Sequence, residues 1–592
     1  MRNNIKLAIA SPQTKVADPF FNASSIENAA KKAAMSGAKI LLTPELSLSA
    51  YTCQDLFYNV SLADSCLKAL VSLTQATCEL DMFIFVGLPI FNGGSVYNCS
   101  LALYKGNIVS VFAKNKMTSY AHERAFSYSL PSSLDINGKQ YIIDSSFTIQ
   151  DDIVLQVAVG AITDVLNTDA HIILNPFCLP SPTDTQYFTS FEPKNKAQMP
   201  VILLSNASCT ESTTDYAFSG QCKIIANEAN FVSQRYELNG SLLIGEVALP
   251  NSVIKSEIII SSQELEAIKR CPYMPKDAAG RAIVIEEILN IQATGILKRM
   301  SHIGTQKTVL GISGGLDSTL SLVALVHAYK KAGFNIKDIC AITMPGFGTS
   351  KTTKNNAVDL IDALGVTKKE ISIKEACMSH FKDIGHDGRP DTAYENAQAR
   401  ERTQILMDYS NMINALMIGT GDLSEEALGF STYNGDQMAM YSPNASIPKT
   451  VIRLIIDHVA QQSDVALKQV LIDILNTPVS PELVNNADNN NHITQKTEDI
   501  LGPYEIHDFF LYYFIIGRMS PKEILQIAIT TFPEYTKDHI HTYLKTFVSR
   551  FFAGQFKRSC SPDGAMAGVL SLSPRGGLFM PSDAQPTAFL DF

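Results

Sequence analysis

The nine residues GISGGLDST, Gly311 to Thr319, constrain the fold more than any other part of this chain. The preceding segment, Thr308–Ser313, is apolar and rich in β-branched residues, which predicts a buried strand. The following segment, LSLVALVHAYKKAG, has apolar residues at helical spacing and ends at Gly333. Two adjacent glycines between them allow a sharp turn and a close approach of a ligand to the backbone. The sequence therefore predicts a strand, a ligand-binding loop and a helix.

The chemistry of this loop favours phosphate together with a metal ion. Backbone N–H groups at the start of a helix attract an anion, and the hydroxyls of Ser313 and Ser318 add donors. Asp317 would repel an anion unless a divalent cation lies between them, which indicates Mg²⁺. The loop is not a Walker A motif, because the spacing and the lysine of G-x-x-x-x-G-K-[ST] are absent. The alternative is an ordinary glycine turn without a ligand.

The loop is similar to SGGxDS, the pyrophosphate-binding loop of the N-type ATP pyrophosphatases. Those enzymes split ATP between the α- and β-phosphates and adenylate a substrate. The resemblance implies an ATP-binding loop made of Gly311, Ile312, Ser313, Gly314, Gly315, Leu316, Asp317 and Ser318.

Length and charge narrow the class of protein. A chain of 592 residues is too long for a single core, so two or more domains are expected. The net charge of −10, without a long basic run, argues against a nucleic-acid partner. The longest apolar runs, such as Phe509–Ile516, are too short to span a bilayer, and the N-terminal apolar stretch is too short for a signal peptide. The 11 cysteines lack CxxC spacing, which predicts reduced thiols in a cytoplasmic protein.

Residues 1–260 alternate short apolar strands with helical stretches, which predicts an α/β domain. Glu45 ends one strand, in TPELSLSAY, and Lys114 ends another, in VFAKNKMTSYAHERAF. These segments resemble the nitrilase/amidase superfamily, whose fold is an αββα sandwich. In that superfamily a glutamate takes the thiol proton, a lysine stabilises the oxyanion and a cysteine attacks an amide carbon. The resemblance implies that Tyr120 helps to hold glutamine and that Glu123 is the accessory carboxylate. The alternative for Glu45 and Lys114 is a structural ion pair.

The nucleophile of that superfamily is missing. Its strand ending in ICED corresponds here to VAVGAITD, Val157 to Asp164, and no cysteine occurs between Cys99 and Cys178. Neither Ala161 nor Ile162 can form a thioester. Cys178 follows the next strand and is the alternative nucleophile, although an unreactive thiol is favoured. We therefore predict a degenerate amidase domain, kept for packing, assembly or regulation.

Residues 261–285 have the polar, proline-bearing character of a linker. In residues 286–592 strands and helices alternate with short connections, which predicts a doubly wound parallel sheet. Ligands of such sheets bind at the carboxyl ends of the strands, where the SGG, TMP and GT segments fall.

The second part resembles glutamine-type NAD⁺ synthetases over nearly its whole length. The segments TMPGFGTS, AYENAQARERTQ, GTGDLSEEALGFSTYNGD, NASIPKTVIR, GPYEIHDFFLYYF and QFKRSCSPDG follow one another in the family's order. The resemblance implies that ATP adenylates nicotinic acid adenine dinucleotide and that ammonia then displaces AMP to give NAD⁺. It places Thr420 at the adenine nucleotide and Mg²⁺ between Asp317 and Glu425.

The resemblance also implies a set of substrate-binding residues: Asn396, Arg400, Glu425, Phe430, Ser431, Thr432, Tyr433, Asp436, Lys449 and Lys557. The family usually has tryptophan at the position of Phe430. A phenyl ring offers less stacking area, so a lower substrate affinity is expected. Lys557 is expected to reach back into the site from the C-terminal part of the chain. The alternative is that the lysine of a neighbouring subunit does so.

The prediction is an ATP- and Mg²⁺-dependent NAD⁺ synthetase that uses free ammonia and forms homo-oligomers, as the family does. One alternative is full glutamine dependence through an unrecognised nucleophile such as Cys178. A GMP or asparagine synthetase is disfavoured by the YNGD and IPKT segments. A non-catalytic assembly scaffold is disfavoured by the intact loop with Asp317 and Glu425.

Overall fold

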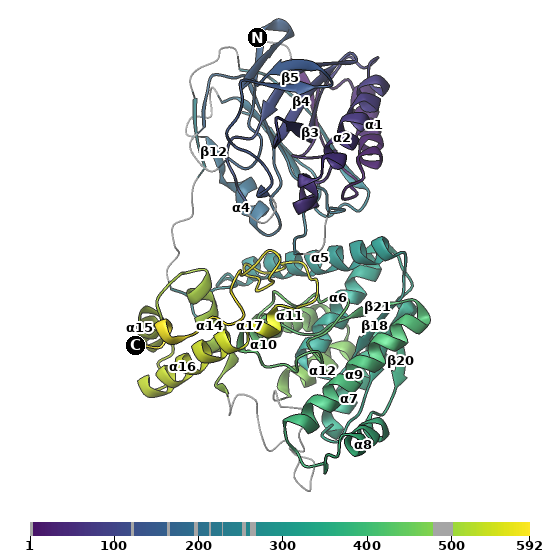
Figure 1. The fold of residues 1–592 in the computed structure, drawn as a ribbon, viewed down its shortest axis with the longest axis vertical. Coiled ribbons are helices and arrows are strands. Elements are labelled where there is room, and N and C mark those ends of the chain that lie inside the picture. Colours follow the sequence, from purple (N-terminus) through teal and green to yellow (C-terminus); the bar gives the residue numbers. More distant parts are fainter. Residues whose placement is uncertain are drawn as a thin grey trace. The chain divides into compact units, whose positions relative to one another are not determined.

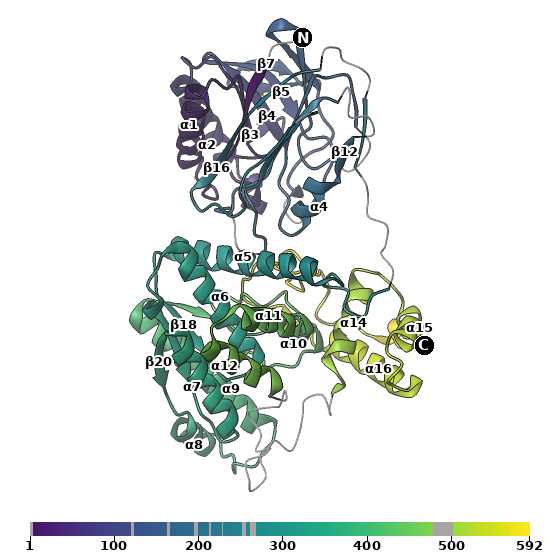
Figure 2. The same ribbon diagram turned by 180° about the vertical axis from the view of Figure 1, so that it is seen from behind.

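A computed structural model describes residues 4–119, 123–162, 166–193, 199–211, 215–227, 229–250, 256–260, 268–477 and 501–592. The chain forms two compact units. The first comprises residues 1–212 and 217–265, and the second comprises residues 213–216 and 266–592. The ribbons of both units are drawn in Figure 1 and Figure 2.

The first unit contains two six-stranded sheets. One has the order β16-β1-β2-β3-β4-β5 and the other the order β15-β14-β13-β11-β9-β8. The strands of the first sheet are β1 (Ile5–Pro12), β2 (Ile40–Leu42), β3 (Phe83–Asn92), β4 (Ser95–Tyr104), β5 (Asn107–Ala113) and β16 (Gly240–Val247). Those of the second are β8 (Ser146–Ile149), β9 (Ile153–Val157), β11 (Ile172–Pro176), β13 (Val201–Ser205), β14 (Cys222–Ile225) and β15 (Asn230–Val232). Smaller sheets are formed by β6 (Ser133–Ile136) with β7 (Lys139–Ile142), and by β10 (Leu166–Thr168), β17 (Ser256–Ile260) and β12 (Phe191–Pro193).

Side-chain alternation along β1 produces the layers of this unit. Leu7 and Ile9 point into the core between the two sheets, whereas Ala8 and Ala10 point to the outer face of the first sheet. That face is covered by α1 (Pro19–Met35) and α2 (Val60–Ala76). The far face of the second sheet packs against α4 (Thr183–Ser190), so the helices lie on opposite sides of the paired sheets (Figure 1). The predicted αββα sandwich is confirmed.

The second unit is built on a parallel sheet with the order β20-β19-β18-β21. Its strands are β18 (Thr308–Gly311), β19 (Ile339–Thr343), β20 (Thr367–Glu370) and β21 (Leu416–Ile418). After two steps in one direction the chain returns past β18 to add β21, so the winding reverses between these two strands. The carboxyl ends of β18 and β21 therefore flank the point where doubly wound sheets bind ligands. The predicted fold class of this part is confirmed as well.

Helices surround this sheet and extend beyond it. They are α5 (Ala278–Ile303), α6 (Leu316–Ala332), α7 (Lys351–Leu364), α8 (Lys374–Asp383), α9 (Thr392–Ile413), α10 (Leu423–Leu428), α11 (Lys449–Gln462), α12 (Val465–Asn476), α14 (Tyr504–Ile515), α15 (Pro521–Thr531), α16 (Lys537–Ala553) and α17 (Gln555–Arg558). On one face of the sheet, Val309 and Met417 pack against Phe381 of α8 and Leu406 of α9. Among the described residues, no helix combines the length and apolarity needed to cross a membrane.

Two predicted segments differ from the observed elements. The third strand is predicted at KEISI, residues 369–373, but β20 spans Thr367–Glu370 at the edge of the sheet. All four side chains of β20 are exposed, so this strand carries no apolar pattern that a sequence could reveal. The predicted linker, residues 261–285, is helical from Ala278 onward, because Asp277 caps α5 by accepting a hydrogen bond from the Gly280 N–H. The polar segment Asp488–Asn491, predicted as a flexible loop, lies outside the described residues.

Candidate active site

The loop after β18 has the geometry of an anion-binding turn. Gly314 has φ of +92°, and a Cβ there would lie 2.1 Å from the carbonyl oxygen of Thr353, so only glycine fits. The N–H of Gly315 donates to Ser313 Oγ over 3.2 Å, and α6 begins at Leu316. Residues of this loop on both sides of Gly314, such as Ser313 and Gly315, line a cavity of about 690 Å³. The loop therefore directs the first N–H groups of a 17-residue helix toward that cavity.

Four charged side chains meet beside this loop. The Lys449 Nζ lies 2.7 Å from Asp317 Oδ2, 2.7 Å from Asp422 Oδ2 and 3.1 Å from Glu425 Oε1. Burial raises the pKa of Glu425 to about 7, against the attraction of Lys449. Burial alone would lower the pKa of Lys449, but the three carboxylates raise it well above its usual range. One ammonium therefore neutralises only part of a cluster of three acids.

This cluster fits a hard divalent cation. Oxygens of Asp317, Asp422 and Glu425 all lie within 4.8 Å of one another. The Asp317 Oδ1 is buried and has no hydrogen-bond partner among the described residues. Carboxylate oxygens are the ligands that Mg²⁺ prefers. Asp422 was not among the predicted site residues, although its place as the N-cap of α10, directly after β21, is a recognisable signal in GTGDLSEE.

A buried asparagine connects the start of α6, directly after the glycine turn, to the segment after β21. The side-chain amide of Asn444 donates to the carbonyl oxygen of Asp317 over 2.9 Å and to Ser321 Oγ over 2.9 Å. The same amide lies 3.5 Å from the carbonyl oxygen of Thr420, which lines the cavity as predicted for a nucleotide contact. Asn444 thus connects the first turns of α6 to the segment that follows β21, and it was not among the predicted site residues.

A second wall of the cavity comes from the segment after α10 and from the C-terminal helices. Phe430, Ser431, Thr432, Tyr433 and Asp436 all line the cavity. Thr432 Oγ1 donates to Asn396 Oδ1 over 2.8 Å, and the Thr432 N–H donates to Asp436 Oδ1 over 2.7 Å. Lys557 Nζ donates to the carbonyl oxygens of Gly429 and Ser431 over 2.8 and 2.6 Å. Lys557 therefore reaches this wall within its own chain.

Two arginines of α9 occupy different environments. Thr392, Asn396, Ala399, Thr403 and Leu406 follow helical spacing along the face that lines the cavity, and Arg402 lies on the same face. The predicted Arg400 is exposed and outside this lining, with its guanidinium 3.4 Å from the carbonyl oxygen of Tyr433. Arg402 also donates to the carbonyl oxygen of Met344 over 3.2 Å. Arg402 shares the helical spacing of the α9 residues that line the cavity, and Arg400 does not. This spacing is the sequence signal that favours Arg402 over Arg400 as a residue of the cavity wall.

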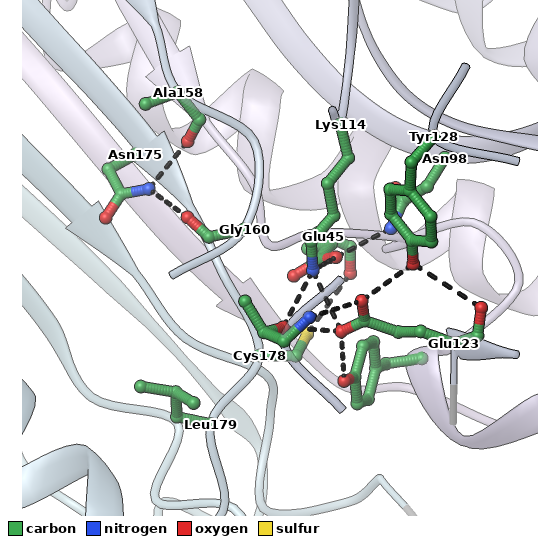
Figure 3. Close-up of polar contacts among 12 residues, drawn as sticks. Glu45, Asn98, Lys114, Glu123, Tyr128, Ala158, Gly160, Asn175, Cys178 and Leu179 are labelled. Atoms are coloured by element: carbon green, nitrogen blue, oxygen red, sulfur yellow. Dashed lines mark hydrogen bonds and ion pairs between the residues drawn. The ribbon is translucent and has the colours of Figure 1, made fainter. Parts of the chain in front are cut away.

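The first unit contains a separate cluster around Lys114, shown in Figure 3. The Lys114 Nζ donates to Glu45 Oε1 over 2.7 Å and to Glu123 Oε1 over 2.9 Å, and all three side chains are at most 2% exposed. Burial raises the pKa of Glu45, although Lys114 opposes this rise. Asn98 donates to Glu45, and the hydroxyls of Tyr51 and Tyr128 donate to Glu123. The predicted Tyr120 lies outside the described residues.

Gly160 stands where a side chain would face this cluster. Its φ is +88°, and a Cβ would lie 2.4 Å from Lys114 Cε and 2.7 Å from Lys114 Nζ. The Gly160 N–H donates to the carbonyl oxygen of Pro176, the last residue of β11, over 2.8 Å. This bond continues the pairing of β9 with β11 beyond the end of β9. Gly160 precedes Ala161 and Ile162, the predicted positions of the missing nucleophile, and it points at the lysine that would stabilise an oxyanion.

Replacement of Gly160 by alanine is expected to lower the thermal unfolding midpoint by several degrees. The methyl group would displace the Lys114 ammonium from two buried carboxylates, in addition to a backbone cost of about 1–2 kcal/mol. Gly138→Ala is the matched control, because Gly138 has φ of +78° and a Cβ there would have nothing within 4 Å. Equal shifts for the two variants in differential scanning calorimetry would contradict a closed Gly160–Lys114 contact.

Cys178 lies close to the cluster but is not activated. Its Sγ donates to the main-chain carbonyl oxygen of Glu45 over 3.3 Å, and its side chain is buried (Figure 3). Burial raises the pKa of the Cys178 thiol well above its usual range, and the nearby charge of Glu45 adds to this rise. A nucleophilic cysteine needs the opposite shift, toward the thiolate.

Comparisons with known proteins identify two family matches in the chain. The family described as carbon-nitrogen hydrolase matches residues 6–176, and the family described as NAD synthase matches residues 288–547. The two matches fall in the first and second structural units, respectively.

Relatives that carry the name of NAD(+) synthetase align with nearly the whole chain. The glutamine-dependent NAD(+) synthetase of Mycobacterium tuberculosis is 29% identical, with 99% of this chain and 97% of that protein covered. The enzyme of the same name from Aquifex aeolicus is 26% identical over 82% of this chain and 85% of its own length. The crystal structure of the Cytophaga hutchinsonii glutamine-dependent NAD(+) synthetase shares the fold, with a TM-score of 0.79, 18% identity and 100% of both chains covered. The Acinetobacter baumannii enzyme, solved with adenosine diphosphate, gives a TM-score of 0.63 at 17% identity, with 99% of this chain and 97% of that chain covered.

Proposed function

Because the chain belongs to the NAD⁺ synthetases, in which a carbon-nitrogen hydrolase domain precedes an NAD synthase domain, we propose that it makes NAD⁺ from free ammonia. The reaction class is the ATP-dependent amidation of nicotinic acid adenine dinucleotide, catalysed by a carbon-nitrogen ligase. The source of nitrogen is what distinguishes this chain within its family.

The observation that carries the proposal is the absence of a nucleophile at Ala161 and Ile162. Neither residue carries a thiol. Gly160, just before them, points at Lys114, and Glu45 and Glu123 both bind this lysine. The alternative thiol, Cys178, donates to a main-chain carbonyl and is buried. No thioester with glutamine can form at Ala161 or Ile162, so the first unit would not release ammonia.

The second unit carries the synthetase chemistry. The carboxylate of the acid dinucleotide attacks the α-phosphorus of ATP, the bond to the β-phosphate oxygen breaks, and pyrophosphate leaves. The N–H groups at the start of α6 and the hydroxyls of Ser313 and Ser318 bind the departing pyrophosphate. Ammonia then attacks the acyl carbon of the adenylate, a proton is lost, and AMP leaves to give NAD⁺.

Asp317, Asp422 and Glu425 would hold Mg²⁺, which neutralises negative charge on the phosphates when it is bound. Lys449 lies among these acids and supplies a fixed positive charge next to them. Its ammonium is suited to contact phosphate oxygens once the carboxylates have another cation.

The acid dinucleotide would lie along the wall formed by Phe430 and Tyr433. Arg550 of α16 lines the same wall, 5.6 Å from the Phe430 ring centre, and donates through Nε to the carbonyl oxygen of Leu428 over 3.0 Å. Together with Lys557 it provides two cations for an anionic substrate. Homo-oligomer formation and a cytoplasmic location stay predictions from the resemblance and the composition.

Glutamate release from glutamine by the purified chain tests the loss of the amidase reaction. The expected result is a rate indistinguishable from buffer, both with and without the synthetase substrates. Robust glutamate release that is abolished in Cys178→Ala would overturn the proposal and establish glutamine dependence through that thiol.

A further inference from the structure

Asp508 is a buried carboxylate of α14 that lies outside the lining of the cavity. Its side chain is almost fully enclosed and accepts from three donors on two other segments. Oδ2 accepts from the Thr450 N–H over 3.0 Å and from the Thr450 hydroxyl, and Oδ1 accepts from the Ser424 hydroxyl. Because burying a charged group costs free energy, a buried carboxylate is retained only where hydrogen bonds satisfy its oxygens.

The donors of Asp508 belong to the two segments that carry the charged cluster. Ser424 lies in the first turn of α10, between Asp422 and Glu425. Thr450 follows Lys449 at the start of α11. The Lys449 N–H donates to Ser424 Oγ over 2.8 Å, so one hydroxyl connects Lys449 to Asp508. The contacts form a continuous path from Lys449 through Ser424 and Asp508 to Thr450.

This path supplies the cap that α11 lacks in its own sequence. Pro448 is the N-cap residue and has no side-chain hydrogen bond, so the first N–H groups of α11 need partners from elsewhere. Ser424 accepts from the Lys449 N–H, and Asp508 accepts from the Thr450 N–H. The negative charge of a carboxylate at this position also interacts favourably with the dipole of the helix. The direction in which α11 begins, and hence the position of the Lys449 side chain, depends on these two residues.

We propose that Asp508 is a positioning residue of the synthetase reaction, which holds Lys449 in register with Asp317, Asp422 and Glu425. The inference rests on the proposed function for its kinetic part. It makes the C-terminal helix α14 a component of the nucleotide site, although Asp508 contacts no substrate.

Asp508→Asn is the test variant, because it keeps the volume of the side chain and replaces one acceptor oxygen by an NH₂ donor. The expected result is a loss of about 100-fold in kcat for ammonium-driven NAD⁺ formation, since a misplacement of about 1 Å can cost that much. The KM for the acid dinucleotide is expected to stay within about threefold of wild type, because the wall at Phe430 is untouched. Tyr273→Phe is the matched control, since Tyr273 donates to the main-chain oxygen of Asp508, over 2.9 Å, and not to its carboxylate.

A binding measurement separates positioning from a merely structural role. With Mg²⁺ and a non-hydrolysable ATP analogue, calorimetry should show weaker binding to Asp508→Asn than to wild type. In a Lys449→Met background, Asp508→Asn should change the affinity by less than about twofold, because additivity fails for residues that act through each other. If Asp508→Asn does not fold, Thr450→Val removes the hydroxyl contact to Asp508, and Ser424→Ala removes both a contact to Asp508 and the acceptor of the Lys449 N–H. Both variants should weaken binding in the same Lys449-dependent way.

The proposal is overturned by equal losses of affinity in the wild-type and Lys449→Met backgrounds, or by a folded Asp508→Asn with wild-type kcat. Failure of the proposed function would look different, because wild-type protein would then form no NAD⁺ from ammonium. The binding comparison would still decide the role of Asp508 in that case.

Discussion

Replacement of Asp317 by asparagine is expected to lower kcat for NAD⁺ formation by about 10³-fold or more, with ammonium and with any other nitrogen donor. Asp317 lies at the start of α6, contacts Lys449 over 2.7 Å and is one of three acids within reach of a common cation. The neutral amide of asparagine removes one negative charge from the set of acids that would hold Mg²⁺. Less positive charge is then held next to the phosphates of ATP. The measurement is the initial rate of NAD⁺ formation at saturating ATP and acid dinucleotide.

Asp359→Asn is a suitable control for Asp317→Asn. Asp359 is an exposed residue of α7 outside the cavity lining, and its replacement removes the same charge from the same unit. We expect it to leave kcat unchanged. An Asp317→Asn enzyme with a rate within about threefold of wild type would show that the predicted loop does not bind the reacting phosphates.

The second large effect is expected on stability. Lys114→Met should destabilise the first unit by about 3–5 kcal/mol, because it leaves the buried carboxylates of Glu45 and Glu123 without their shared cation. The kcat for ammonium-driven NAD⁺ formation should stay unchanged below the unfolding transition. Denaturant unfolding followed by circular dichroism, together with the ammonium assay, measures both quantities.

Lys68→Met controls for the loss of a lysine in the same unit. Lys68 lies on the exposed side of α2, so its removal should alter the free energy of unfolding by no more than about 0.5 kcal/mol. If Lys114→Met unfolds at the same denaturant concentration as wild type, Lys114 does not stabilise a closed cluster. If it lowers the ammonium rate, the first unit contributes to the synthetase reaction.

The sequence was sufficient for the parts of the site that depend on local backbone rules. Adjacent glycines between an apolar strand and an apolar helix can form few structures, so the turn at Ser313–Ser318 was predictable. Strand ends in parallel sheets meet at one edge, so the SGG, TMP and GT segments could be assigned to one crevice, whereas the roles of Thr420 and Glu425 came from the resemblance. The alternation of short apolar strands with helical stretches in residues 1–260 likewise predicted an α/β domain.

The parts that escaped prediction depend on contacts between distant segments. Asn444 joins the start of α6 to the segment after β21, and Asp508 caps α11 from α14, and neither role leaves a local pattern. The edge strand β20 was misplaced because its exposed side chains carry no apolar signal. Gly160 was not predicted to matter, since only the direction of its missing Cβ toward Lys114 shows what a side chain there would meet.

The central claim is that this chain makes NAD⁺ from free ammonia because its amidase-like unit has no thiol at Ala161 or Ile162, where the resemblance places the nucleophile. Its most direct test is NAD⁺ formation from nicotinic acid adenine dinucleotide, ATP and Mg²⁺, with ammonium or glutamine as the only nitrogen source. We expect saturable NAD⁺ formation with ammonium, and with glutamine a rate no higher than that of its contaminating ammonia. Equal rates at equal low concentrations of the two donors would contradict the claim.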